Sequence, residues 1–229
     1  MEECLSSKPD PTQACVVDSD CSPAAASEGA ERFMKLYSYV VQHDNGQAPN
    51  PYFGVCTLCL CKFRKSLKKN RNIVELARKG DWIFGTGGAD LRKSAGHGKL
   101  VYAMRVTAEP ITRGEYYAAL QFADKKPVKN GTYEQTRGDN KRPRNHFEKH
   151  DQFALISDDF YYFGRKAIDI LERFDLEKIG PGFRSDFNPD VIREVVKWLE
   201  KKRKVGINGE PCYRAVDKSK GSRRCKSSC

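Results

Sequence analysis

The feature that most constrains the fold is a pair of apolar segments, residues 80–88 and 99–107, separated by a polar stretch. The first contains Trp82, Ile83 and Phe84, and the second contains Leu100 and Val101, so both are rich in the residues that favour strands. The two segments therefore predict a hairpin around which the rest of the chain is organised.

This hairpin holds more glycine than a simple turn needs, at Gly85, Gly87, Gly88, Gly96 and Gly98. Glycine lets the backbone take positive φ angles or approach a ligand closely, so the segment predicts a ligand-binding opening lined by main chain. A β-bulge followed by a mobile loop is the alternative explanation. The pattern is not a phosphate-binding P-loop, because no Gly-Lys-Ser/Thr ends it.

Further elements follow from local patterns. Strands are predicted at residues 34–41, 55–61 and 153–157, and a long loop at 125–145. Helices are predicted after Asn72, after Thr112, from about Arg165 to Phe174 and from Pro189 to Lys204. Together these elements predict an α+β fold, with a small mixed or antiparallel, β-barrel-like sheet flanked by helices.

Charge divides the chain into unequal parts. Residues 1–31 carry seven acids and one lysine, a net charge of −6 within a total of +11, so residues 32–229 carry +17. We expect a disordered acidic leader at 1–32, a single α+β domain at 33–206 and a basic disordered tail at 207–229. A strongly basic domain favours polyanions, so DNA or a nucleotide is the expected partner. A solvated lysine-rich surface, or an adaptor that meets an acidic protein, is the alternative.

Composition also limits the compartment and the cofactors. No apolar run approaches the roughly 20 residues of a membrane span, and the N-terminus lacks a signal-peptide pattern, so a cytoplasmic location with reduced thiols is expected. Cys56-x-x-Cys59-x-Cys61 has metal-ligand spacing, and His146 and His150 could complete a zinc site. Alternating buried cysteines on a strand are the favoured explanation. We therefore expect neither a metal nor a cofactor.

Four residues are candidates for proton transfer. His43 and Asp44 follow a strand end, Asp139 lies in the long loop, and Asp158 follows another strand. With His150 and Asp159 they supply the acids and histidines that an acid–base site needs. Asp158 and Asp159 could also hold magnesium, although a strand-exit turn is the favoured interpretation.

Several blocks in a fixed order resemble the nucleotide modification associated domain two family: Ala48-Pro-Asn-Pro, Gly80-Asp-Trp-Ile-Phe-Gly-Thr-Gly, Leu100-Val-Tyr-Ala-Met-Arg-Val-Thr, Gly138-Asp-Asn and Leu155-Ile-Ser-Asp-Asp-Phe-Tyr-Tyr-Phe-Gly. The resemblance spans about residues 34–172. It implies a phage-related role in DNA base hypermodification, with partner enzymes of that pathway. The order of a basic segment, a Gly-Asp strand and a strand ending Val-Thr also resembles PUA-like barrels, in which loops around the Gly-Asp strand bound a base pocket.

Two functions follow. The first is a nucleic-acid-binding or nucleotide-binding domain of a DNA modification system, which holds a base in the glycine opening and phosphates on basic side chains. Its candidate residues are Asn50, Lys62, Arg64, Lys65, Lys68, Gly85, Thr86, Gly87, Tyr102, Arg105, Asn140 and Tyr162. The second is an enzyme that modifies a nucleotide or a base through the four acid–base candidates. Both need a base that is accessible to the protein.

Overall fold

The computed structural model describes residues 32–59, 63–64, 71–139, 153–178 and 181–213. Its strands are β1 (Leu36–Val41), β2 (Cys56–Leu58), β3 (Phe63–Arg64), β4 (Arg71–Asn72), β5 (Trp82–Gly87), β6 (Lys99–Arg105), β7 (Ile111–Thr112), β8 (Phe153–Ser157), β9 (Asp159–Tyr162), β10 (Ile168–Asp169), β11 (Phe183–Arg184) and β12 (Gly206–Ile207). Its α-helices are α1 (Ile73–Leu76), α2 (Arg113–Ala118), α3 (Tyr133–Thr136) and α4 (Pro189–Lys202). Three 3-10 turns are η1 (Leu120–Lys125), η2 (Gly164–Lys166) and η3 (Glu172–Phe174).

The main sheet has seven strands in the order β11-β1-β5-β6-β9-β12, with β10 added beside β6. β5 and β6 pair antiparallel, as the two apolar segments predict, and the register shifts between Gly85 and Thr86. β1 lies parallel to β5 on the other side. The sheet is therefore mixed and confirms the α+β class, and within the described residues it does not close into a barrel.

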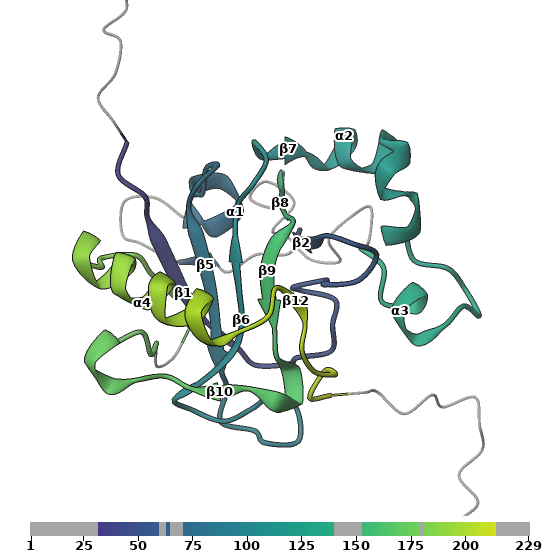
Figure 1. Cartoon of the computed structure of the whole chain (residues 1–229). Coiled ribbons are helices and arrows are strands. Elements are labelled where there is room, and N and C mark those ends of the chain that lie inside the picture. Colours follow the sequence, from purple (N-terminus) through teal and green to yellow (C-terminus); the bar gives the residue numbers. More distant parts are fainter. Residues whose placement is uncertain (1–31, 60–62, 65–70, 140–152, 179–180, 214–229) are drawn as a thin grey trace, which may run out of the picture. The chain divides into compact units, whose positions relative to one another are not determined.

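Each face of the main sheet is covered differently. Helix α4 lies across β1, β5 and β6 in Figure 1, and Ile192, Val195 and Leu199 on it pack against the face that carries Trp82 and Phe84. Its start follows local signals, because Asn188 caps the helix and Pro189 occupies the first turn. The apolar residues of α4 therefore recur at the helical spacing that the sequence predicts, and they bury this face of the sheet.

The opposite face packs against a second, three-stranded sheet. β2, β8 and β7 form this sheet, and β8 continues through Asp158 into β9 of the main sheet. Behind it, α2 begins with a capping box between Thr112 and Glu115. The buried ring of Tyr116 on α2 packs in a third apolar cluster with Phe122. Residues 50–55, which lead into β2 of this second sheet, form part of the candidate site described below.

Two regions differ from the sequence prediction. The helix expected from Arg165 to Phe174 is replaced by η2, β10 and η3. Gly164 takes a φ of +53°, and the chain after η2 becomes extended so that Ile168 pairs with Leu100 of β6. The long loop expected at 125–145 contains the short helix α3, which also starts with a capping box, between Thr132 and Gln135.

Residues 206–213, which we call the C-terminal strap, pack against β9. The sequence analysis places the end of the domain at residue 206, where this segment begins. Gly206 and Ile207 pair with Tyr161 and Tyr162 as a parallel strand. Farther along, the backbone N–H of Cys212 donates to Asp44 Oδ2 at 2.9 Å. Within the part of the chain that the structure describes, no helix is both long and apolar enough to cross a bilayer.

Candidate functional site

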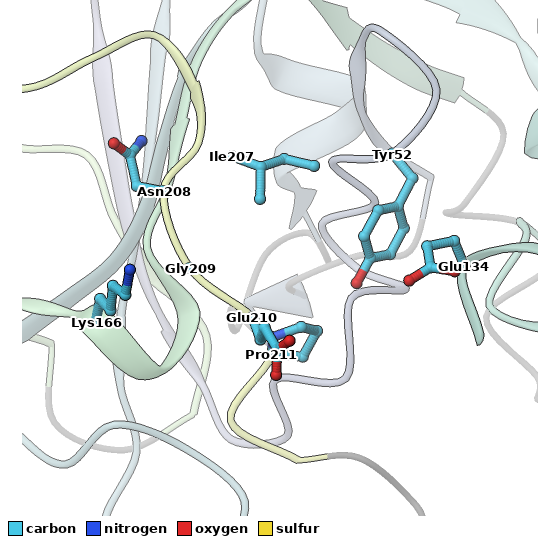
Figure 2. A pocket seen from close by; sticks show the side chains of 8 residues that line it. All are labelled: Tyr52, Glu134, Lys166, Ile207, Asn208, Gly209, Glu210 and Pro211. Atoms are coloured by element: carbon cyan, nitrogen blue, oxygen red, sulfur yellow. The ribbon is translucent and has the colours of Figure 1, made fainter.

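The C-terminal strap forms one wall of a pocket of about 500 Å³. The pocket is lined by Tyr52, Glu134, Lys166, Ile207, Asn208, Gly209, Glu210 and Pro211. Figure 2 shows the Tyr52 ring and the Glu134 carboxylate on one side, with Lys166 and Asn208 on the other. An aromatic ring, a cation and hydrogen-bonding groups therefore face one volume.

Tyr52 belongs to a short hairpin loop, residues 50–57, which we call the aromatic turn. Its ends are joined by two backbone hydrogen bonds of 2.9 Å between Asn50 and Thr57. The backbone N–H of Tyr52 donates to Asn50 Oδ1 at 3.2 Å. At the tip, Phe53 and Gly54 both have positive φ angles, and the Phe53 ring is 40% exposed. The aromatic turn thus carries an exposed Phe53 ring next to the Tyr52 ring, which is only 8% exposed.

A buried lysine fixes the inside of this turn. Lys125, at the end of η1, is 1% exposed, and its Nζ donates to Asn50 O at 2.9 Å and to Val55 O at 2.5 Å. Burial lowers the pKa of Lys125, and the nearby Asp139 carboxylate opposes that change. A buried ammonium group is tolerated only when acceptors receive hydrogen bonds from its N–H groups. Here the carbonyl oxygens of the aromatic turn are those acceptors.

Asp139 completes the same buried cluster. Its Oδ2 accepts hydrogen bonds from Thr57 Oγ1 at 2.8 Å and from the Tyr116 hydroxyl at 2.6 Å. Its Oδ1 is buried with no hydrogen-bond partner among the described residues. Burial raises the pKa of Asp139, and the two hydroxyl donors oppose that rise. Two predicted site residues, Asn50 and Asp139, are therefore brought together through Lys125, which the sequence analysis did not identify.

The glycine-rich opening that the sequence predicts is filled by the protein itself, so that prediction is wrong. A Cβ on Gly85 would lie 2.2 Å from Tyr102 Cε1, and one on Gly87 would lie 1.9 Å from Gly96 O. Thr86 between them is buried and donates to Tyr39 O at 3.2 Å. These glycines allow other parts of the chain to pack closely against the strand, because glycine has no side chain in the way.

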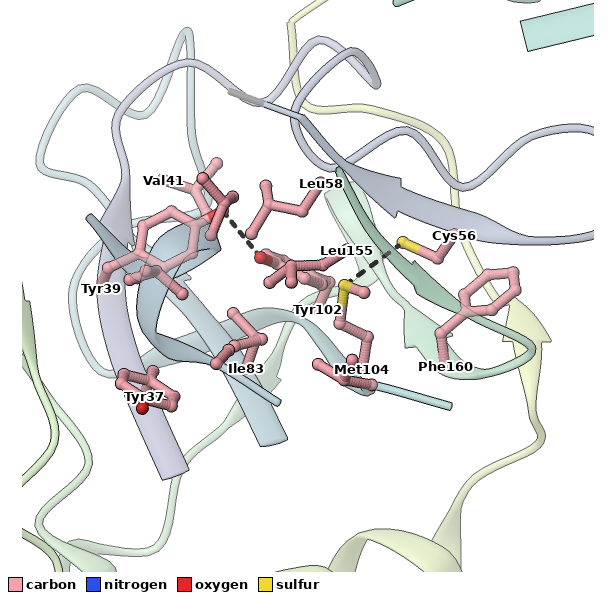
Figure 3. Packing of buried hydrophobic residues seen from close by; sticks show 14 of the residues in the cluster. Tyr37, Tyr39, Val41, Cys56, Leu58, Ile83, Tyr102, Met104, Leu155 and Phe160 are labelled. Carbon is pink, nitrogen blue, oxygen red and sulfur yellow. Dashed lines mark hydrogen bonds between the residues drawn. The ribbon is translucent and has the colours of Figure 1, made fainter. Parts of the chain in front are cut away.

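The two tyrosines expected to hold a base are also buried, so the structure contradicts their placement at an opening. Figure 3 shows the hydroxyls of Tyr39 and Tyr102 joined inside the apolar cluster, at 2.7 Å. The Tyr162 hydroxyl donates to Asp44 Oδ1. Neither Tyr102 nor Tyr162 has an exposed ring face, because both are 0% exposed.

The structure does not unite the four acid–base candidates. Asp44 is buried, and burial raises its pKa while hydrogen bonds from Tyr162 and Cys212 oppose the rise. His43 beside it is exposed, with its ring centroid 6.4 Å from that of Tyr213. Asp158 is exposed at the junction of β8 and β9, the end of β9 away from Tyr162. No hydrogen bond or ion pair joins these four described residues to one another, and a single site built from them stays a prediction.

At that same end of β9, Arg105 forms an ion pair of 3.0 Å with Asp159. Arg105 lies opposite Asp159 in the β6–β9 register, whereas the pocket residue Ile207 lies beside Tyr162 at the other end of β9. The length of β9 therefore separates Arg105 from the pocket. The guanidinium expected to bind nucleic acid is thus engaged by a carboxylate of the neighbouring strand.

Some predicted residues lie outside the described part of the chain. These are Lys62, Lys65, Lys68 and Asn140, together with the candidate zinc ligands Cys61, His146 and His150. Arg64 lies in β3, where the structure describes only the backbone. Cys56 and Cys59 are buried, and burial raises the pKa of Cys56 to about 12. Among the described residues, no group of three or more histidines, cysteines or acids could hold a metal ion.

Comparison with known proteins gives one match. The sequence model described as nucleotide modification associated domain 2 matches residues 33–154 and 142–218, which include both the pocket and the buried cluster. No curated protein and no solved structure matches the chain.

Proposed function

The chain belongs to the nucleotide modification associated domain 2 family, and we propose that it binds a nucleotide, or one nucleotide of a DNA strand, in the pocket beside Tyr52. In this role it would serve a DNA base hypermodification system alongside partner enzymes. The observation that carries the proposal is the pocket itself, in which an aromatic ring and a lysine face one volume of about 500 Å³.

The size and lining of the pocket suit this ligand. Small-molecule sites range from about 300 to about 1,000 Å³ and combine apolar walls with a few placed polar groups. Here Tyr52, Ile207 and Pro211 supply apolar surface, and Glu134 and Asn208 supply hydrogen-bonding groups. The Glu134 carboxylate can accept from an exocyclic amino group of a base.

Charge supports a phosphate on the Lys166 side. Lys166 and its neighbour Arg165 are exposed, and Arg165 is held by a hydrogen bond of 3.0 Å from its Nε to Pro211 O of the C-terminal strap. The basic part of the chain carries +17. A charge of this size attracts polyanions over a Debye length and releases counterions on binding, so affinity falls as salt rises.

Fluorescence anisotropy with a short labelled oligonucleotide tests the proposal. We expect the whole protein to bind at about 50 mM salt and to bind far more weakly at about 200 mM salt. Lys166→Met removes one phosphate contact, so it should weaken binding and reduce the slope of log affinity against log salt by about one. Lys197→Met is the matched control, because Lys197 is exposed on α4, which contributes no described residue to the lining of the pocket.

Absence of binding at low salt would contradict the proposal. So would equal effects of Lys166→Met and Lys197→Met, since the attraction would then belong to the overall charge and not to the pocket.

A second candidate function, an enzyme that modifies a nucleotide by acid–base chemistry, is favoured by one observation. Asp139 has a raised pKa and a buried Oδ1 without a partner among the described residues, a combination found at catalytic carboxylates. Mass spectrometry of nucleotides and DNA incubated with the protein tests it. A change in mass that Asp139→Asn abolishes would support catalysis, and unchanged masses with the native protein would exclude it for those substrates.

A further inference from the structure

We propose that the exposed Phe53 ring, backed by Tyr52, forms a stacking site for an unpaired base, so that the ligand is a free or single-stranded nucleotide and not an intact duplex. This inference rests on the proposed nucleotide binding and names the class of nucleic acid that the pocket takes. It follows from the backbone, the exposure and the support of the aromatic turn.

The backbone at Phe53 is strained. Its φ of +60° lies in the left-handed region, followed by Gly54 at +84°. Successive residues with positive φ favour asparagine and glycine at a tight turn, and a bulky aromatic residue there is an outlier. Residues with such strain cluster at active sites and ligand-binding sites, so the outlier supports a functional role for the Phe53 ring.

The exposure of the ring indicates what that use is. Phe53 is 40% exposed, although a phenyl ring gains free energy by burial. Its ring centroid lies 6.3 Å from that of Tyr52 in an edge-to-face arrangement. Tyr52 in turn lines the pocket. The exposed Phe53 ring therefore lies next to a residue that lines the pocket, where a planar ligand can reach it.

The turn that carries these rings is rigidly supported. Asn50 Oδ1 holds the Tyr52 amide, while Lys125 Nζ holds the carbonyls of Asn50 and Val55 from inside. Thr57 at the other end is bound to Asp139. A turn fixed in this way loses little conformational entropy when a ligand binds, which is the advantage of a preorganised site.

Stacking on the Phe53 ring requires a free base face. In a duplex both faces of each base are covered by neighbouring base pairs, whereas a single strand or an extruded nucleotide exposes them. Base–aromatic stacking tolerates any base, because every base has a π-face. The pocket beside Tyr52 can then receive the sugar and phosphate on its Lys166 side.

The test compares a single-stranded oligonucleotide with its duplex, using the whole protein and fluorescence anisotropy at low salt. We expect the native protein to bind the single strand at least about tenfold more tightly than the duplex. Phe53→Asn should lose about tenfold in single-strand affinity, and Phe53→Tyr should retain most of it. Leu91→Ala is the control, because Leu91 is an exposed apolar residue (74%) in the glycine-rich region.

A second measurement separates binding from folding. Asparagine tolerates the left-handed conformation, so Phe53→Asn should melt at the same temperature as the native protein or a few degrees higher. A variant that is at least as stable and yet binds more weakly supports a functional role of the ring.

Three outcomes would overturn the inference: equal affinity for single strand and duplex, unchanged single-strand affinity in Phe53→Asn, or an equal loss in Leu91→Ala. If these occurred while Lys166→Met still weakened binding, nucleotide binding in the pocket would stand and only the stacking site would fail. If no oligonucleotide or nucleotide bound at low salt, the proposed function itself would fail.

Discussion

The glycine-rich hairpin of β5 and β6 and the aromatic turn at residues 50–57 use glycine in opposite ways. In the hairpin, Gly85 and Gly87 have protein atoms where a Cβ would lie, at 2.2 Å and 1.9 Å. In the aromatic turn, nothing lies within 4 Å of the corresponding position on Gly54, whose φ is +84°. Glycine provides close packing in the first region and backbone conformation in the second.

The difference supports the proposed entry of a ligand at the aromatic turn. A cluster of glycines in strands indicates close approach of some atoms, and in this chain they are the protein's own Tyr102 ring and Gly96 carbonyl. The aromatic turn has one glycine, but its neighbour Phe53 is exposed and strained. We therefore propose the binding surface from the exposure of the Phe53 ring and not from the number of glycines.

The largest expected effect is on Gly87. Gly87→Ala places a methyl group against the backbone oxygen of Gly96, which has no flexible end that can move aside, so we expect a loss of about 3 kcal/mol or more in unfolding free energy. Gly54→Ala meets no atom and should cost about 1 kcal/mol, from backbone strain alone. Urea unfolding of both variants measures the contrast. If the Gly87→Ala protein kept native stability but no longer bound nucleotide, the result would support ligand binding at the glycine-rich hairpin and contradict this comparison.

The next effect concerns the support of the aromatic turn. Lys125→Met leaves the carbonyls of Asn50 and Val55 without their buried donor, so we expect a loss of about 3 kcal/mol. It should also increase hydrogen exchange of the turn and weaken single-strand binding. Lys129→Met, at an exposed lysine nearby, should stay within about 0.5 kcal/mol of the native protein. Native stability in Lys125→Met would show that the turn does not depend on this lysine.

The smallest effect is a pH dependence at Asp139. Because burial raises the pKa of this carboxyl in the folded state, the native protein holds a proton that the unfolded chain releases. Its contribution to stability therefore falls as pH rises from the ordinary value of 3.8 through the raised pKa, and stays constant above it. Asp139→Asn removes this penalty, so its stability relative to the native protein should rise with pH across that window and stay level above it.

Urea unfolding of both proteins at a series of pH values measures this difference. Asp44 also has a raised pKa, but it is present in both proteins and its contribution cancels in the comparison. A difference that stays constant with pH would mean that Asp139 is ionised in the fold as readily as in the unfolded chain.

Local signals in the sequence account for the regular elements. The apolar pair at 80–88 and 99–107 predicts β5 and β6, Thr112 predicts the start of α2, and Asn188 with Pro189 predicts the start of α4. The predicted helix at 165–174 is wrong because pairing of Ile168 with Leu100, which is remote in sequence, makes the chain extended there. Elements are thus predictable where the causes lie within a few residues.

The site was predictable only in part, for the same reason. Asn50 and Asp139 were among the predicted residues, but the residue that joins Asn50 to the buried cluster is Lys125, 75 residues farther along the chain. Nothing in its local sequence, Asp124-Lys125-Lys126, distinguishes a buried lysine from an exposed one. Tyr102 and Tyr162 were expected at an opening, although alternation along their strands turns both into the core. Phe53 followed by Gly54 in a proline-rich segment was the available signal for an exposed aromatic turn.

Photocrosslinking tests the central claim most directly, because it reports which ring touches a base. A single-stranded oligonucleotide that carries 5-iodouracil is bound at low salt and irradiated, and the modified peptides are identified by mass spectrometry. We predict adducts on the peptide that contains Tyr52 and Phe53, which disappear in competition with unlabelled single strand. Adducts confined to the peptides that contain His97 or Tyr102, in the glycine-rich hairpin, would contradict the account.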